Sequence, residues 1–172
     1  TAEALLARGD EVVGFDNFNS FYDPAIKRRN ATALSQHRRF SLVEADLCDE
    51  PALAALFTRD RFDAVVHLAG APVSEKWTDE HKKAILVSRE TGTRNLVAGL
   101  AALDAAERPG TLVSASAVGY YGPRGDDPVP ESTPPADDFL ADVCVRWENE
   151  ALEAQDLGLR VVLLRTGIVL DA

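Results

Sequence analysis

The sequence has little cysteine and no metal-binding pattern. Its two cysteines, Cys48 and Cys144, lie far apart, so they form neither a disulfide framework nor a metal-ligand spacing. The three histidines, His37, His67 and His81, are scattered and show no zinc pattern. We therefore predict no metal site, and the scarcity of cysteine favours a reducing, cytoplasmic location.

Long hydrophobic runs and positive charge are also scarce. No apolar run approaches the roughly 18 residues that a membrane span needs, and no signal segment opens the chain. The 18 Lys and Arg residues face 28 Asp and Glu residues, which gives a net charge of -10. This surplus argues against nucleic acid and anionic membranes as partners. The length of 172 residues fits one domain with a sizeable core.

Apolar strands and helices alternate along the chain. A first helix stops at Gly9, and Pro24 opens a second helix at a favoured first-turn position. The predicted strands are 11–15, 40–45, 64–68, 111–116 and 160–164, and the later helices are 51–57, about 79–106 and 139–155. This alternation predicts an α/β fold with a doubly wound parallel sheet of the Rossmann type.

The glycine-rich phosphate loop of that fold is missing. A dinucleotide-binding domain begins with a strand, then G-x-G-x-x-G, then a helix, whereas this chain begins inside the helix. Gly119, Gly122 and Gly125 lie in a predicted long functional loop and do not match that motif. We therefore expect residues 1–172 to be a truncated NAD(P)-binding Rossmann domain. The first strand, the glycine-rich loop and a C-terminal substrate domain would be absent. Because the first strand is central, its loss predicts a gap in the sheet.

Polar residues follow two of the predicted strands. Asp16 can accept the ribose hydroxyls of adenosine and repel a 2′-phosphate, although loop-starting aspartates are common. Asn17 and Asn19 can add hydrogen bonds to the ribose and phosphate. Asp46 and Leu47 either face the adenine edge or, as an equal alternative, form the N-cap of the next helix.

Further candidates follow the later strands. The segment Leu68, Ala69 and Gly70 contains small residues, which let the backbone approach a cofactor closely. The preceding His67 is expected to pack in the core. Ser116 can polarise a substrate carbonyl, although strand-end serines also bond loop backbone. The Ser114 side chain is expected to point into the packed interior. Arg89 lies one helical turn before Thr93, a position at which its side chain could face the cofactor crevice.

Two parts of the chain resemble different branches of the extended short-chain dehydrogenase/reductases. Residues 9–68, with GDEVVGFDNFNSFYDPAIKRRN and FSLVEADLCDEPALAALF, resemble nucleotide-sugar epimerases of the UDP-glucuronate 4-epimerase type. From Ala69 onward the motifs AGAPVSEKWTDEHKKAI, SRETGT, SASAVGYYG, DDFLADVCVRWENEA and RVVLLRTGIVL resemble an atypical epimerase-like family. The two resemblances meet near residues 67–70. A natural hybrid protein and a sequence-assembly error would both produce this change of resemblance.

The resemblance implies an NAD cofactor, with NADP as the alternative, and a small-molecule substrate such as a nucleotide sugar. It also leaves a homodimer open. It places the catalytic serine of the class at Ser116. The implied cofactor contacts are Asp16, Asn17, Asn19, Asp46, Leu47, Leu68, Ala69, Gly70 and Arg89.

One departure from the class affects the expected chemistry. The class uses a Tyr-x-x-x-Lys pair in which lysine lowers the pKa of the tyrosine. Alignment through Glu148 puts Leu140 and Cys144 at those two positions, as in the atypical family. Two hypotheses remain: an NAD(P)-dependent epimerase or oxidoreductase, or a non-catalytic dinucleotide-binding sensor that lacks the pair.

Overall fold

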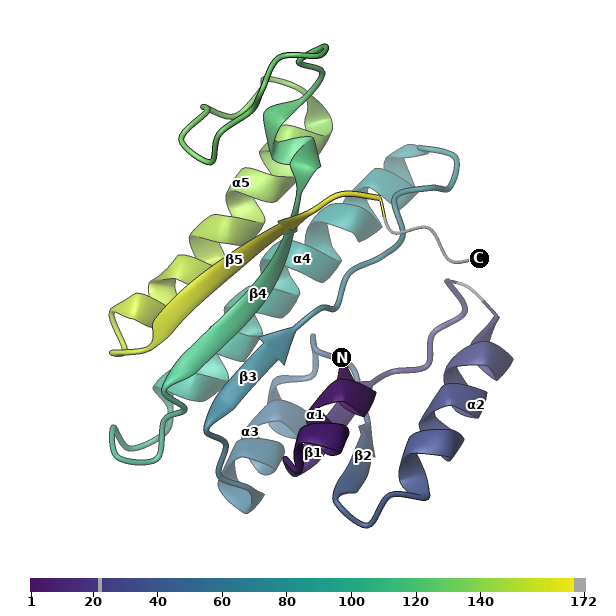
Figure 1. The fold of residues 1–172 in the computed structure, drawn as a ribbon, viewed down its shortest axis with the longest axis vertical. Coiled ribbons are helices and arrows are strands. Elements are labelled where there is room, and N and C mark those ends of the chain that lie inside the picture. The colour runs from purple at the N-terminus through teal and green to yellow at the C-terminus, as the bar shows by residue number, and fades with distance from the viewer. Residues whose placement is uncertain (22, 169–172) are drawn as a thin grey trace.

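The computed structural model describes residues 1–21 and 23–168. Strands and helices alternate as the sequence predicts (Figure 1). The strands are β1 (Val12–Asp16), β2 (Phe40–Glu44), β3 (Ala64–His67), β4 (Thr111–Ala117) and β5 (Arg160–Thr166). The α-helices are α1 (Ala2–Arg8), α2 (Pro24–Ser35), α3 (Glu50–Arg59), α4 (Asp79–Ala101) and α5 (Phe139–Leu152). Short 3-10 turns, η1 (Val118–Tyr121) and η2 (Glu153–Gln155), follow β4 and α5.

Side-chain caps explain where four of the helices begin. In each case an oxygen of the capping side chain accepts a hydrogen bond from a backbone N–H of the first turn, which has no partner within the helix. The caps are Asp23, Asp49, Thr78 and Asp138. At the other end of α1, Gly9 has a φ of 100°, the left-handed conformation that glycine adopts readily, and it ends the helix as predicted.

The sheet is interrupted at the predicted place. β1 pairs with β2, and β4 lies between β3 and β5, with every pair parallel. Among the described residues no strand pairs β1 with β3, so the two pieces form separate sheets (Figure 1). The Rossmann-type fold and the gap at the position of a central strand are therefore both confirmed.

The main core lies between the three-stranded sheet and the helices α4 and α5. Alternate residues of β4, Leu112, Ser114 and Ser116, are buried, as the two-residue period of a strand requires. Leu112 packs in one cluster with Leu100 of α4 and Ala151 of α5. This packing holds the carboxyl end of β4 against α5, where the candidate catalytic serine lies.

The end of α4 differs from the expectation. The sequence predicts a helix to about residue 106, but α4 ends at Ala101. The Arg108 guanidinium donates to the carbonyl oxygens of Ala101 (3.1 Å) and Leu103 (3.2 Å). Because these bonds satisfy carbonyls that a longer helix would use, the chain turns earlier towards β4.

The long loop between η1 and α5 is tied to the rest of the fold at several points. Arg124 donates to the carbonyls of Tyr121 (2.7 Å) and Pro134 (3.0 Å), and Arg165 of β5 donates to the carbonyl of Glu131 (3.1 Å). The loop therefore follows a path that two arginines define.

Among the described residues, no helix is both long and apolar enough to cross a membrane.

Candidate functional site

Four predicted residues form one hydrogen-bonded group at the carboxyl ends of β1 and β2. Asp16 ends β1, and its Oδ1 accepts from the backbone N–H of Phe18 at 2.7 Å. The Asn17 amide donates to Asp46 Oδ2 at 2.6 Å, and Asn17 Oδ1 accepts from the backbone N–H of Asn19 at 3.1 Å. Asp16 Oδ2 accepts no hydrogen bond from the described residues. The group thus presents oxygen acceptors that suit hydroxyl or amino donors of a ligand.

Asp46 is not the N-cap of the next helix. That cap is Asp49, whose Oδ1 accepts from Ala52 N–H at 3.1 Å. Asp46 Oδ1 instead accepts from the N–H of Cys48 at 2.8 Å, and this bond lowers the pKa of the Asp46 carboxyl. Asp46 therefore remains an anion at neutral pH, free to serve the first of its two predicted roles.

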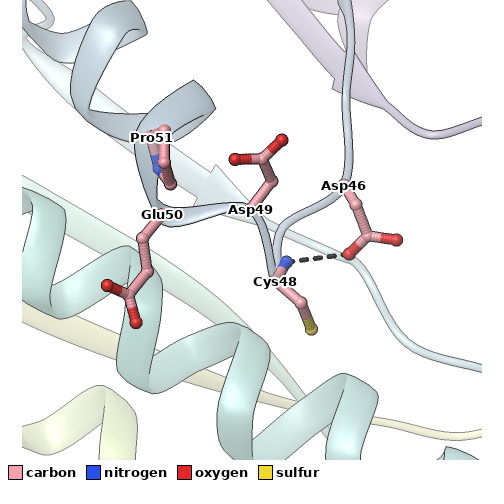
Figure 2. A pocket seen from close by; sticks show the side chains of 5 residues that line it. All are labelled: Asp46, Cys48, Asp49, Glu50 and Pro51. Atoms are coloured by element: carbon pink, nitrogen blue, oxygen red, sulfur yellow. Dashed lines mark hydrogen bonds between the residues drawn. The ribbon is translucent and has the colours of Figure 1, made fainter.

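A surface hollow lies beside Asp46. It has a volume of about 500 Å³, and Figure 2 shows its lining residues, Asp46, Cys48, Asp49, Glu50 and Pro51. Three of these side chains are carboxylates, so the hollow favours ligand groups that donate hydrogen bonds. Leu47 lies outside it and packs against α4, where a Cβ at Gly92 would lie 3.1 Å from Leu47 Cδ2.

The predicted residues after β3 surround an arginine of α4. Leu68, 54% exposed, Ala69 and Gly70 form an exposed segment. The Arg89 guanidinium lies against Gly70, where a Cβ would be 2.8 Å from Arg89 Cζ. Arg89 Nη1 donates to the carbonyl of Ala71 at 2.8 Å. Gly70 is therefore needed to admit the guanidinium, and Arg89 brings a positive charge to this strand end.

His67 belongs to the core, as expected. Its buried ring bonds Thr93 Oγ1 through Nε2 at 2.8 Å and meets the Trp147 ring edge-on. Burial and then the charge of Arg89 lower the His67 pKa to about 4, so the ring is neutral at pH 7. The Arg89 guanidinium also stacks over the Trp147 ring, 4.9 Å from its centroid. Ser114 is fully buried and points into packing, as predicted.

Ser116 is bound to a buried carboxylate. Its hydroxyl, 2% exposed, donates to Glu148 Oε1 at 2.5 Å. Arg165 of β5 pairs bidentately with Glu148, with Nε to Oε1 and Nη2 to Oε2 both 2.8 Å. Arg165 also donates to the Tyr121 hydroxyl at 2.8 Å and stacks over Tyr120, 3.6 Å from its ring centroid. The hydroxyl proton of Ser116 is thus committed to Glu148 rather than to a ligand.

Leu140 and Cys144 lie where the tyrosine and lysine of the class are expected. The Leu140 Cβ is 3.4 Å from the position of a Cβ on Gly119, and Cys144 Sγ donates to the Ala117 carbonyl at 3.8 Å. Both contacts place the pair beside the carboxyl end of β4, next to Ser116. Burial raises the pKa of the Cys144 thiol, so it remains uncharged at neutral pH. Neither side chain supplies the acid–base pair.

The glycines after β4 do not form a phosphate site. Gly119, Gly122 and Gly125 have the spacing G-x-x-G-x-x-G, but Gly119 lies within η1, the other two lie in the long loop after it, and the next α-helix begins only at Phe139. Backbone N–H groups of a helix N-terminus, which bind phosphate in such motifs, are therefore not adjacent to them. Gly122 has a φ of 62°, and a Cβ there would lie 2.5 Å from Ala136 Cβ. That glycine serves the turn.

Three site residues were not predicted from the sequence. Lys27 contacts Asp16 and Glu148 contacts Ser116, each from a different element of the chain, and Arg165 contacts Glu148. Their sequence separations from those partners, 11, 32 and 17 residues, follow no short motif. Glu148 gave the one usable signal, because it shares the helical spacing of Cys144 and Ala151 on the buried face of α5, and buried carboxylates are almost always paired.

The fold and the polar strand ends define a dinucleotide-binding α/β protein of the short-chain dehydrogenase/reductase class. A sequence model of the NAD dependent epimerase/dehydratase family matches residues 1–170. The chain belongs to that family, and the predicted family and the NAD cofactor of that family are confirmed.

Relatives of both predicted kinds match the chain. An epimerase family protein of Arabidopsis thaliana, the chloroplastic SDR39U1 homolog, is 46% identical over 107 residues, 62% of this chain and 30% of that protein. UDP-glucuronate 4-epimerase 6 of the same plant is 37% identical over 128 residues, 74% of this chain and 27% of that protein. The chain thus spans about a third of the length of these relatives.

A solved structure agrees with the fold. UDP-glucuronic acid 4-epimerase from Bacillus cereus, in complex with NAD, superposes with a TM-score of 0.80 at 21% identity. The superposition covers 96% of this chain and 52% of that one. The homodimer and the cytoplasmic location stay predictions.

Proposed function

We propose that this chain is part of the cofactor-binding domain of an NAD-dependent, epimerase-like enzyme that acts on a nucleotide sugar. The observation that carries the proposal is the acceptor group at the ends of β1 and β2. Among the described residues, one carboxylate oxygen of Asp16 has no partner, and Asn17 and Asp46 are fixed beside it. Curated relatives named as UDP-glucuronate 4-epimerases support the substrate class.

The residues present fit the nucleoside end of NAD. Ribose hydroxyls and the adenine amino group are hydrogen-bond donors, and they match the carboxylate oxygens of Asp16 and Asp46. The exposed segment 68–70 would let backbone approach the dinucleotide, and Arg89 would bring a positive charge to it. In the part of the chain that the structure describes, no strand is followed by a glycine-rich turn and a helix of the kind that binds a pyrophosphate. We propose that such a unit, and a C-terminal substrate domain, lie outside this chain.

Bound NAD supplies the hydride acceptor for chemistry at a sugar carbon. The contribution of this chain is to hold and orient. Ser116 donates its hydroxyl hydrogen bond to Glu148, so the lone pairs of its oxygen would be what it offers to a substrate hydroxyl. Arg165 fixes that arrangement by binding both oxygens of Glu148.

A specific observation favours the second candidate, a dinucleotide-binding protein without catalysis. Alignment through Glu148 assigns Leu140 and Cys144 to the acid–base positions, and the Ser116 hydroxyl is buried and already bonded. A positioned acid–base group contributes about 10²- to 10⁴-fold to a rate, so its loss predicts slow turnover. Such a protein would respond to NAD through binding alone.

One experiment separates the candidates. NAD binding to the full-length protein is measured by calorimetry, and conversion of a set of nucleotide sugars that includes UDP-glucuronic acid is followed by NMR at saturating NAD. Binding with conversion supports the enzyme, binding without conversion of any nucleotide sugar supports the sensor, and no binding overturns both. Asp16→Ala should weaken binding in either case. Residues 1–172 alone should bind NAD more weakly than micromolar, because the pyrophosphate site is mostly backbone N–H groups of the glycine turn.

A further inference from the structure

Lys27 lies against two of the residues that we assign to the adenosine ribose. It is in the first turn of α2, and its side chain is only 10% exposed. Its ammonium donates to Asn19 Oδ1 at 3.0 Å and to Asp16 Oδ1 at 3.3 Å. A lysine buried to this degree is held in place by its partners, because lysine is otherwise among the most exposed residue types.

The ion pair changes the electrostatics of Asp16. A lone carboxylate at this strand end selects NAD, because it repels the 2′-phosphate of NADP, whereas a nearby cation accommodates that phosphate. Here both are present, since Lys27 balances the charge of an Asp16 side chain that is itself 44% exposed. The Asp16 carboxylate alone favours NAD over NADP, because it repels the 2′-phosphate.

The neighbouring cation does not share this role. Arg28 pairs bidentately with Glu44, at 2.7 and 3.1 Å, and stacks over the Phe18 ring, 4.6 Å from its centroid. Its charge is thus directed at Glu44, whereas that of Lys27 is directed at Asp16. Among the described residues, Lys27 is the cation that forms an ion pair with Asp16.

We propose that Lys27 is a specificity-determining residue of the cofactor site, which lets the site accept NADP alongside NAD by balancing Asp16. This inference rests on the proposed function. Lys27 also positions Asp16, because it binds Oδ1 and leaves Oδ2 for the ribose. The site therefore discriminates weakly between the two cofactors, and Lys27 rather than Asp16 sets the ratio of the NAD and NADP affinities.

The test is a comparison of NAD and NADP dissociation constants in the full-length protein. Lys27→Gln should weaken NADP binding about tenfold more than NAD binding, the order expected for one charge contact near a protein surface. Lys27→Arg keeps the charge and should keep the wild-type ratio. Arg29→Gln is the matched control, since it removes an equal charge from an exposed neighbour on the same helix. It should leave the ratio unchanged.

A second pair of variants covers a Lys27→Gln protein that does not fold. Asp16→Asn leaves the Lys27 charge unbalanced and should shift the preference towards NADP. The double variant Asp16→Asn with Lys27→Gln should not show this increase in NADP affinity relative to NAD. Equal weakening of both cofactors in Lys27→Gln, or an unchanged preference in Asp16→Asn, would overturn the role of Lys27. A wild-type protein that binds neither cofactor would instead overturn the proposed function.

Discussion

Ser116 and Glu148 form a hydrogen-bonded pair between β4 and α5, with Ser116 Oγ donating to Glu148 Oε1 at 2.5 Å. Both side chains are at least 95% buried, and Arg165 binds the other side of the carboxylate. The residue expected to act on a substrate is thus also part of a structural network. Its two roles can be separated by experiment.

The network should contribute measurably to stability. Glu148→Gln breaks a buried ion pair and leaves the Arg165 guanidinium without its counter-ion, which should cost about 3 kcal/mol of unfolding free energy. Ser116→Ala removes one charge-assisted hydrogen bond and should cost about 2 kcal/mol. Urea denaturation of the full-length protein measures both. Arg146→Gln, which breaks an exposed pair with Asp142, is the control and should cost under about 0.5 kcal/mol. Equal small losses in all three would show that the network is not stabilising.

The position of the missing acid–base pair predicts how activity responds to substitution. Cys144→Ala should be nearly silent for turnover, because its thiol is uncharged and bonded to backbone. Ser116→Ala should reduce any turnover. Leu140→Tyr with Cys144→Lys should raise it, towards the factor of about 10²- to 10⁴-fold that such a pair supplies. Steady-state rates with UDP-glucuronic acid check all three, with circular dichroism to confirm folding. A large loss in folded Cys144→Ala would show that the catalytic centre lies elsewhere.

The two thiols should react differently with an alkylating reagent. Cys48 is exposed beside Asp46, whereas Cys144 is buried. Burial raises the pKa of both thiols, and at Cys48 the Asp46 charge raises it further, so labelling should accelerate only at alkaline pH, as thiolate forms. Mass spectrometry of the native protein should find Cys48 labelled and Cys144 unlabelled. Saturating NAD should slow labelling of Cys48. Unchanged labelling with NAD bound would place the adenine away from the hollow in Figure 2.

His67 should make stability depend on pH. Its pKa of about 4 in the folded protein lies below the ordinary value near 6.5, so between these values the unfolded chain binds more protons. The contribution of the neutral His67 ring to the unfolding free energy is therefore fully present above about pH 6.5, and it decreases as the pH falls towards 4. The loss should reach about 3 kcal/mol. His67→Gln should flatten this part of the profile in urea denaturation, whereas His37→Gln, at an exposed position, should not. Parallel profiles for His67→Gln and wild type would contradict the assignment.

Much of the fold followed from local patterns in the sequence. Strand and helix positions were predictable because apolar periodicity, Pro24 at a helix start and Gly9 at a helix end act through residues close in the chain. The interruption of the sheet was also predictable, because strand order in this fold is fixed by its topology. The early end of α4 was not, since it depends on Arg108 folding back onto Ala101.

The candidate site divides in the same way. The sequence alone indicated that Asp16, Asp46, Gly70 and Ser116 lie at or just after the carboxyl ends of parallel strands. Only the tertiary structure decided what those side chains bind, because the partners come from distant helices and strands. Lys27 balances Asp16, and Glu148 accepts the hydrogen bond of the Ser116 hydroxyl. The charge and proton state of a site depend on what lies within a few ångströms of it, and for these residues only folding brings those groups together.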